Sequence, residues 1–218
     1  MFTLGVTLLW SYTRVGHGTE LGIAPFALTG YTSVLLWRNP VNRAINAIET
    51  NNALRYHRNV RVFDIVAARS LLEIVGVLGS FGFLVLALIA FDMTRAPVEV
   101  DRLCVALVMQ SLLGVALSLF VSAMAQMSEF TERIWHVVTY LLFPLSGTVF
   151  MVEWLPAPMR SALTWVPVVH GSEAIRHGFF GAVVKTHEDW SYQSSCILVL
   201  LGAGLFGLRH VGRSLEVE

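Results

Sequence analysis

The sequence predicts an all-α polytopic membrane protein, because apolar residues are abundant and lie in continuous runs. Of the 218 residues 55% are hydrophobic and only 14% are charged, whereas an ordinary soluble domain is about a quarter charged. The mean hydropathy is +0.64. Lipid cannot satisfy free backbone groups, so spanning segments must be helices or a closed barrel. Continuous rather than alternating apolar runs favour helices over a barrel.

Six candidate spans follow one another, at about 2–12, 21–37, 71–91, 103–125, 134–152 and 191–208. The first is short for a bilayer, which needs about 20 apolar residues, and the second contains Pro25 and Gly30, which membrane helices tolerate. The chain opens on the apolar stretch MFTLGVTLLW, so we expect a short first span there rather than a removed signal peptide. No repeat or polar linker divides the sequence, and we expect a single transmembrane domain over residues 1–218.

The arginines between the spans predict that both termini are cytoplasmic. Lys and Arg are retained on the inner side of a membrane. The segment 38–70, between the second and third spans, is rich in them: Arg38, Arg43, Arg55, Arg58, Arg61 and Arg69. The other long connection, 153–190, then lies on the outer face. The formal net charge is zero, so nothing suggests a nucleic-acid partner.

The inner segment 38–70 predicts a short amphipathic helix followed by a cationic edge. Apolar residues recur there at helical spacing: Val41, Ala44, Ile45 and Ile48. Asn51 and Asn52 could cap such a helix. Beyond them, Arg55, Arg58 and Arg61 repeat at three-residue intervals. This pattern suits an acidic protein partner or lipid phosphates, and a simple topology anchor explains the same cations.

Glu73 enters the third apolar run one turn after Arg69. An i,i+4 ion pair would neutralise a carboxylate that is costly in hydrocarbon. We therefore predict a structural pair rather than a proton relay, which needs ionisable groups near the middle of the bilayer.

The segment FPLSGTVFMVEWLPAPMRSALTWVPVVHGSEAIRHGFFG is too apolar for a solvated loop and is rich in proline and tryptophan. Pro144 and Gly147 interrupt the fifth span, and irregular backbone at that depth is tolerated only against protein or a water-filled path. We therefore expect residues 153–190 to form a re-entrant or membrane-seated hairpin. Interface anchoring explains Trp154 and Trp165 equally well, but it does not explain the prolines.

Catalytic patterns are weak in this chain. His170, Glu173 and His177 do not form the HExxH arrangement of a helical metal site, and no metal is expected. Ser146 beside Gly147, with His170 downstream, leaves an intramembrane serine hydrolase open as an alternative. The sequence contains no GxxxxGK[ST] run, so any ATP must be bound by another chain.

Three stretches resemble the membrane subunits of type-2 ATP-binding-cassette exporters, and most closely those of the capsular polysaccharide export branch. They are NRAINAIETNNALRYHRNVRVFDIVAAR after the second span, FPLSGTVFMVEWLP at the end of the fifth, and WVPVVHGSEAIRHGFFG before the sixth. Val166 stands where relatives commonly have Asn. Relatives also usually begin with a basic amphipathic helix before the first span, whereas this sequence starts within an apolar run.

The resemblance implies a homodimer of six-helix subunits in the bacterial inner membrane, with a central path for lipid-linked polysaccharide. Two copies of a separate ATPase would bind ATP and Mg²⁺, so this chain needs no cofactor of its own. A periplasmic copolymerase-type export protein is a further candidate partner. A type-2 permease for a drug, a lipid, or a teichoic-type or O-antigen polymer is the alternative.

The same resemblance assigns roles to individual residues. Coupling to the ATPase falls to Asn51, Asn52, Leu54, Arg55, Tyr56 and Arg58. The outer gate hairpin takes Pro144, Ser146, Gly147, Trp154, Pro156, Pro167, His170, Glu173 and Arg176. Aromatic faces that could bind sugars along the translocation path are those of Tyr140, Phe150 and Trp154.

Overall fold

The computed structural model describes residues 21–47, 61–128 and 130–217, and within these ranges it is helical, without a strand. The long helices are α2 (Ile23–Ile45), α5 (Val62–Ala90), α6 (Val100–Met127), α7 (Phe130–Leu145) and α10 (Trp190–Val217). The shorter elements are the 3₁₀ turn η1 (Val152–Trp154), α8 (Ala157–Leu163), α9 (Pro167–Phe180) and the 3₁₀ turn η2 (Gly181–Val183).

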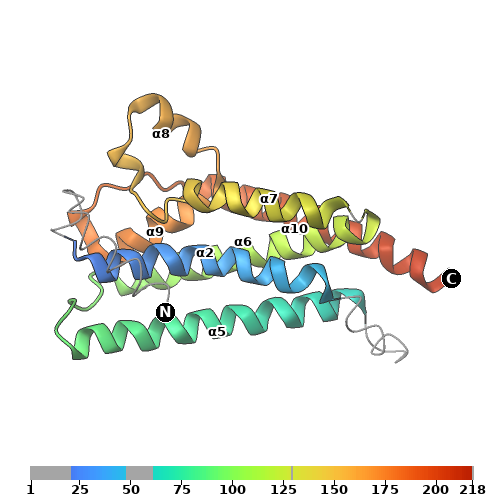
Figure 1. Ribbon diagram of the computed structural model, residues 1–218, viewed down its shortest axis with the longest axis horizontal. Helices are drawn as coiled ribbons and strands as arrows, with labels where there is room; N and C mark the ends of the chain where they lie inside the picture. Colours follow the sequence, from blue (N-terminus) through green and yellow to red (C-terminus); the bar gives the residue numbers. More distant parts are fainter. Residues whose placement is uncertain (1–20, 48–60, 129, 218) are drawn as a thin grey trace.

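The long helices run side by side, so the connections gather at two opposite ends (Figure 1). One end holds the C-terminus of α2, the N-terminus of α5 and the turn between α6 and α7. The other holds the connection from α5 to α6 together with α8 and α9. We call these the inner and the outer end, following the arginine distribution. The two long connections therefore lie at opposite ends, as predicted.

Helix α6 is the centre of the bundle and packs against α2, α5, α9 and α10. Half of its most apolar stretch is buried, against 22% for the corresponding stretches of α5 and α10. In lipid no strong hydrophobic force drives helices together. Helix association therefore depends on close packing of the backbones, which small residues allow. Glycines occupy the contacts with α2, α9 and α10: Gly114, Gly178 and Gly204. A Cβ at Gly178 would lie 2.5 Å from the backbone nitrogen of Leu103.

A buried amide network links α6 to three neighbouring helices. Gln110 is fully buried, and its Nε2 donates to the carbonyl oxygens of Ser33 at 3.2 Å and Val168 at 3.4 Å. Its Oε1 accepts a hydrogen bond from Gln193 of α10 at 3.2 Å. Because buried polar groups are costly unless paired, this network fixes how α2, α9 and α10 sit around α6.

Three of the described helices are long and apolar enough to cross a membrane: α5, α6 and the Trp190–Gly212 part of α10. They correspond to the predicted third, fourth and sixth spans. Helices α6 and α10 extend beyond the predicted limits at both ends, and α5 begins nine residues earlier and ends one residue earlier than predicted. The predicted fifth span ends early, because α7 stops at Leu145 after 16 residues. The predicted first span lies outside the described residues.

The predicted inner segment 38–70 is shorter than expected. Helix α2 passes through Pro40 and ends at Ile45, and α5 begins at Val62. The helical spacing of Val41, Ala44 and Ile45 was read correctly, and these residues belong to the last turns of α2. All three side chains are buried, so they continue the packed face of α2, which stabilises the helix beyond the proline. The rest of the predicted helix, from Ile48 on, lies outside the described residues.

The predicted partner of Glu73 was also wrong. Its carboxylate pairs with Nε of Arg43 at 3.0 Å, whereas Arg69 was expected. Arg43 lies on α2 and Glu73 on α5. The charge pair therefore joins two helices near the inner end instead of stabilising one.

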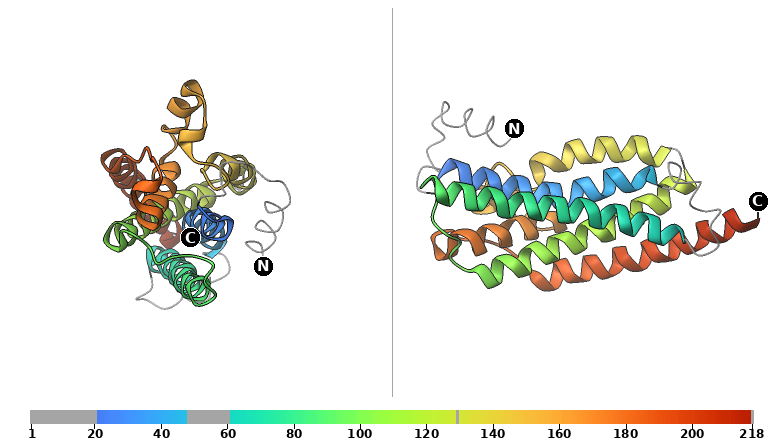
Figure 2. Two further views of the ribbon diagram at one scale, coloured as in Figure 1. Left: turned by 90° about the vertical axis from the view of Figure 1, so that its left-hand side faces the viewer. Right: turned by 90° about the horizontal axis from the view of Figure 1, so that it is seen from below.

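The outer segment does contain short helices, and its prolines begin them. Pro156 precedes α8, and Pro167 is the first residue of α9. Proline suits these positions because the first helical residues need no N–H partner. Figure 2 shows α8 projecting sideways from the bundle, on the side away from α5.

Candidate functional site

The chain leaves helical geometry at the outer end of α7. The helix contains Pro144 and ends at Leu145, and Gly147 follows with φ of 74°. This left-handed backbone conformation favours glycine. Residues 146–151 therefore present backbone carbonyl groups that no helix satisfies.

Arg176 of α9 satisfies three of these carbonyl groups. Its guanidinium donates to the carbonyl oxygens of Gly147, of Thr148 at 2.8 Å and of Phe150 at 2.7 Å. The side chain is fully buried. A guanidinium carries five N–H donors in a rigid plane, so one side chain can bind several backbone oxygens of a turn. We call Arg176 and residues 147–150 the arginine cradle.

Helix α2 closes the arginine cradle from the other side. The guanidinium of Arg176 lies over the ring of Phe26, 4.0 Å from its centroid, an arrangement that attracts a cation to the ring face. One turn further along, Gly30 leaves room for the guanidinium, because a Cβ there would lie 2.7 Å from its Nη2. The cradle therefore joins α2, α9 and the turn after α7.

Two further residues of α9 hold backbone groups near the cradle. Glu173 is fully buried, and its carboxylate accepts the backbone N–H groups of Val152 and His187, both at 3.3 Å. Ser172 donates its hydroxyl to the carbonyl oxygen of Ser146 at 2.9 Å. Glu173 and Arg176 are three residues apart and share one helical face. That face binds the connection after α7 and the stretch that follows η2.

The structure brings together most of the residues predicted for the outer gate. Pro144, Ser146 and Gly147 belong to the end of α7 and the turn that follows it. Glu173 and Arg176 bind the backbone around this turn. Trp154 joins them indirectly, because its ring stacks on Phe26 with centroids 5.4 Å apart, and Phe26 lies beneath the guanidinium.

The three predicted path aromatics do not form one group. Phe150 contributes its carbonyl oxygen to the arginine cradle, and Trp154 stacks on Phe26. Tyr140 lies on α7 and is 72% exposed, with the guanidinium of Arg38 6.0 Å from its ring centroid. Among the described residues, no ring contact joins Tyr140 to Trp154.

Charged residues that the sequence did not single out hold the two ends of the predicted hairpin 153–190 together. Glu153 pairs with His187 at 2.6 Å, Arg160 at 2.9 Å and Lys185 at 3.1 Å. The pKa of Glu153 is lowered to about 2, mainly by the hydrogen bond from His187 and to a smaller extent by the one from Lys185. The carboxylate therefore stays ionised and keeps η1 and α8 close to residues 185–187 at neutral pH.

A second charged cluster joins α6, α9 and residues 186–188. Glu188 pairs with Arg102 and lies 3.0 Å from Nδ1 of His177. Burial alone would raise the pKa of Glu188. Hydrogen bonds from Thr186, from its own backbone and from Arg102, together with the charge of His177, outweigh burial and lower this pKa. The spacing of these residues along the chain gave no sign of this cluster.

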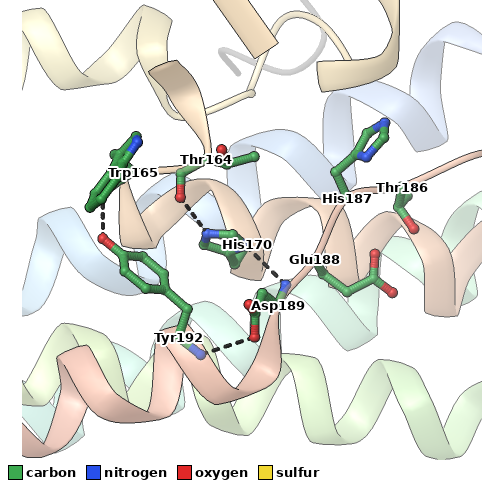
Figure 3. A pocket seen from close by; sticks show the side chains of 8 residues that line it. All are labelled: Thr164, Trp165, His170, Thr186, His187, Glu188, Asp189 and Tyr192. Atoms are coloured by element: carbon green, nitrogen blue, oxygen red, sulfur yellow. Dashed lines mark hydrogen bonds between the residues drawn. The ribbon is translucent and has the colours of Figure 1, made fainter. Parts of the chain in front are cut away.

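A pocket of about 650 Å³ opens beside α9 at the outer end. Its lining comes from the turn between α8 and α9, from His170, and from the stretch 186–192 (Figure 3). Most of these residues were not predicted as site residues. The turn before α9 and the stretch that begins at Thr186 are more than 20 positions apart in the sequence. They meet because the connection after α9 runs back to His170, which accepts the N–H of Asp189.

The hydrogen bonds of Ser146 and His170 do not fit a hydrolase. Ser146 donates to the carbonyl oxygen of Phe143 at 2.8 Å. His170 bonds the carbonyl oxygen of Thr164 through Nε2 and accepts the N–H of Asp189 at Nδ1. The nucleophile is thus not hydrogen-bonded to a base, as a serine hydrolase requires. Within the described ranges no three His, Cys, Asp or Glu side chains form a metal site.

The residues predicted to couple the chain to an ATPase lie outside the described residues. They are Asn51, Asn52, Leu54, Arg55, Tyr56 and Arg58. Their role stays a prediction. The flanking helices α2 and α5 place both ends of this segment at the inner end of the bundle (Figure 1).

Comparison with known proteins finds one family and several relatives. Residues 49–180 match the ABC-2 type transporter family. The capsule polysaccharide export inner-membrane protein BexB of Haemophilus influenzae is 34% identical over 218 residues, which are 100% of this chain and 82% of the relative. CtrC of Neisseria meningitidis serogroup B, a protein of the same description, is 36% identical over 98% of this chain and 79% of its own length. The polysialic acid transport protein KpsM of Escherichia coli is 24% identical over 91% of this chain and 78% of its own length.

Replacing Arg176 tests whether the arginine cradle holds the outer end together. Arg176→Ala leaves three backbone oxygens without a donor, and each buried acceptor left unsatisfied costs about 1–3 kcal/mol, so we expect a loss of about 3 kcal/mol of stability or more. Arg176→Lys keeps the charge but lacks the fork and should recover only part of this loss. The thermal unfolding midpoint of the purified protein in detergent measures the effect.

Arg95→Ala is the matched control, because Arg95 is exposed in the connection between α5 and α6 at the same end. This variant should unfold at the wild-type temperature. An unchanged midpoint for Arg176→Ala would show that the cradle carries no stability.

Proposed function

Because this chain belongs to the ABC-2 type transporter family, we propose that it is the membrane-spanning subunit of an ATP-driven exporter of lipid-linked capsular polysaccharide across the bacterial inner membrane. The observation that carries the proposal is its identity of 34% and 36% to two capsule polysaccharide export inner-membrane proteins, over 98–100% of its length. The similarity includes the turn after α7 and all of α9, where the arginine cradle lies.

A separate ATPase supplies the energy in this proposal. The chain has no phosphate-binding GxxxxGK[ST] loop, so ATP and Mg²⁺ are bound by the partner subunit. In this proposal the segment 48–60 binds that partner through Arg55, Tyr56 and Arg58. A closing motion of the ATPase is then passed to α2 and α5, which flank the segment and are joined by the Arg43–Glu73 pair.

The proposed topology has six spans with both termini in the cytoplasm. The described helices α2, α5, α6 and α10 provide four of them, α7 enters as the fifth, and residues 2–12 are the first. Arginines in the connection after α2 favour this orientation. The segment 153–190, between α7 and α10, then acts on the outer face as the gate, with the arginine cradle as its fixed point.

The translocation path of the proposed homodimer lies between two copies of the chain. The exposed face of α7 supports this placement, because Val137, Tyr140 and Leu141 are 59–72% exposed. An aromatic ring such as that of Tyr140 offers a sugar an apolar face with a polar tip. Binding through single rings is weak, which allows a polymer to slide.

Genetic replacement tests the proposed export function. Deleting the gene should abolish the polysaccharide at the cell surface and leave polymer inside the cell, and the wild-type chain supplied from a plasmid should restore export. Surface and internal polymer are measured separately with a capsule-specific antibody, before and after permeabilisation. A deletion strain with normal surface polysaccharide would contradict the proposal and favour a type-2 permease for another substrate.

Charge reversal tests the coupling segment. Arg55→Glu with Arg58→Glu should abolish export while the chain still inserts, because the acidic side chains would repel the proposed acidic face of the ATPase. The matched control is Arg55→Lys with Arg58→Lys, which keeps the positive charge that sets topology. Co-purification of the ATPase and surface polysaccharide are the two readouts. Normal export by a correctly inserted Arg55→Glu, Arg58→Glu protein would exclude the coupling role.

A further inference from the structure

Apart from His170, the residues that line the pocket beside α9 are not among those predicted for the gate or the path. The pocket lies at the outer end, where the turn between α8 and α9 faces the start of α10 (Figure 3). Its volume of about 650 Å³ falls within the range of about 300–1,000 Å³ that is usual for small-ligand sites. Trp165 stands at its edge and is 75% exposed. A ligand in the pocket would cover part of this large exposed indole, which explains why it lies there.

The wall of the pocket is fixed by hydrogen bonds between three segments. The hydroxyl of Tyr192 donates to the carbonyl oxygen of Trp165 at 2.7 Å. The ring of His170 lies 5.2 Å from that of Tyr192. Because Nδ1 of His170 accepts the N–H of Asp189 at 3.0 Å, its Nε2 carries the proton and donates to the carbonyl oxygen of Thr164 at 2.8 Å. The aromatic side of the pocket is therefore held in place before any ligand binds.

Asp189 provides an oriented acceptor next to this wall. Its Oδ1 accepts the backbone N–H groups of Ser191 at 2.9 Å and Tyr192 at 3.0 Å, at the start of α10. Its other oxygen, Oδ2, has no hydrogen-bond partner among the described residues, and the side chain is exposed. A carboxylate oxygen is a strong acceptor for hydroxyl donors. One oxygen therefore fixes the carboxylate, and the other is left for a ligand.

An aromatic face beside a fixed carboxylate matches the surface of a sugar ring. A pyranose presents C–H groups on its faces and hydroxyl donors around its edge, so it can pack on an indole and donate to a carboxylate together. A lipid phosphate fits less well, because Asp189 would repel it. A metal ion fits no better, since the described residues form no group of three ligands there.

We propose that this pocket is a saccharide subsite at the outer end, which binds hydroxyl-bearing sugar units of the exported polymer as they leave the gate. The inference rests on the proposed export function and adds a place where the substrate is held. Trp165 packs on the sugar face, and Asp189 accepts its hydroxyl groups. Binding through one indole and one carboxylate is weak enough to be released at each step of export.

Oligosaccharide binding to the assembled transporter tests the subsite. The probe is a set of oligosaccharides released by mild acid from the capsule of the producing bacterium. Binding is measured by calorimetry on the chain together with its ATPase in lipid nanodiscs. Trp165→Ala should weaken binding about 2- to 10-fold, as expected for the loss of one aromatic contact, and Trp165→Phe should recover part of the affinity. Asp189→Asn should also weaken binding, although its remaining carbonyl oxygen can still accept the two N–H groups at α10.

Met159→Ala is the control, because Met159 lies on α8, is 58% exposed and does not line the pocket. It should bind as the wild type does. If Trp165→Ala and Asp189→Asn bind oligosaccharide with wild-type affinity, the subsite is excluded. That result leaves the export function standing, because gene deletion tests that function independently.

A second readout separates sugar binding from membrane anchoring by Trp165. Brominated lipids quench the fluorescence of tryptophans that enter the bilayer interface. The difference in quenching between wild type and Trp165→Ala therefore measures the contact of Trp165 with lipid. If the subsite exists, this difference in quenching should be small. Added oligosaccharide should also reduce the difference in fluorescence between wild type and Trp165→Ala. Strong quenching of Trp165 that oligosaccharide does not change would make it a lipid anchor and overturn the proposal.

Discussion

The hydrogen bonds from Arg176 to three backbone carbonyl groups are the interaction on which the outer half of the molecule depends. A membrane protein can break a helix only where other groups satisfy the freed backbone. Here α7 ends at Leu145, and a buried guanidinium takes over the role of the missing helical N–H groups. Phe26 and Gly30 of α2 accommodate that guanidinium. These contacts of Arg176 with α2 fix the position of α9 against α2.

The two ends of the bundle are built differently, and this suits a transporter that receives force at one end and releases substrate at the other. At the inner end, the Arg43–Glu73 pair joins α2 and α5 on either side of the segment proposed to meet the ATPase. At the outer end, Glu173, Arg176 and the clusters around Glu153 and Glu188 bind a set of short elements to α6 and to one another. Movement at the inner end can then reach the proposed gate through α2, because α2 carries Arg43 at the inner end and Phe26 beneath Arg176 at the outer end.

Sequence reasoning found the long apolar helices and the place where the chain becomes irregular, because hydropathy, proline and glycine report these locally. It did not foresee how Arg176 acts, since the partners of its guanidinium are backbone oxygens that no residue type identifies. It misplaced the end of α2, because the apolar run stops at Trp37, whereas the buried Val41 and Ala44 continue the helix to Ile45. The charged clusters were missed because Glu153 and His187 meet across 34 positions.

Cysteine accessibility tests most directly the central claim that α9 is a protein-buried helix at the outer face. In a background with Cys104 and Cys196 replaced, the account predicts that a cysteine at the exposed Lys185 reacts with an impermeant thiol reagent added outside intact cells. Cysteines at the buried positions Leu163 and Val168 should react poorly from either side. Labelling of Lys185→Cys only after the membrane is opened would contradict the orientation, and labelling of Val168→Cys as fast as Lys185→Cys would contradict the buried helix.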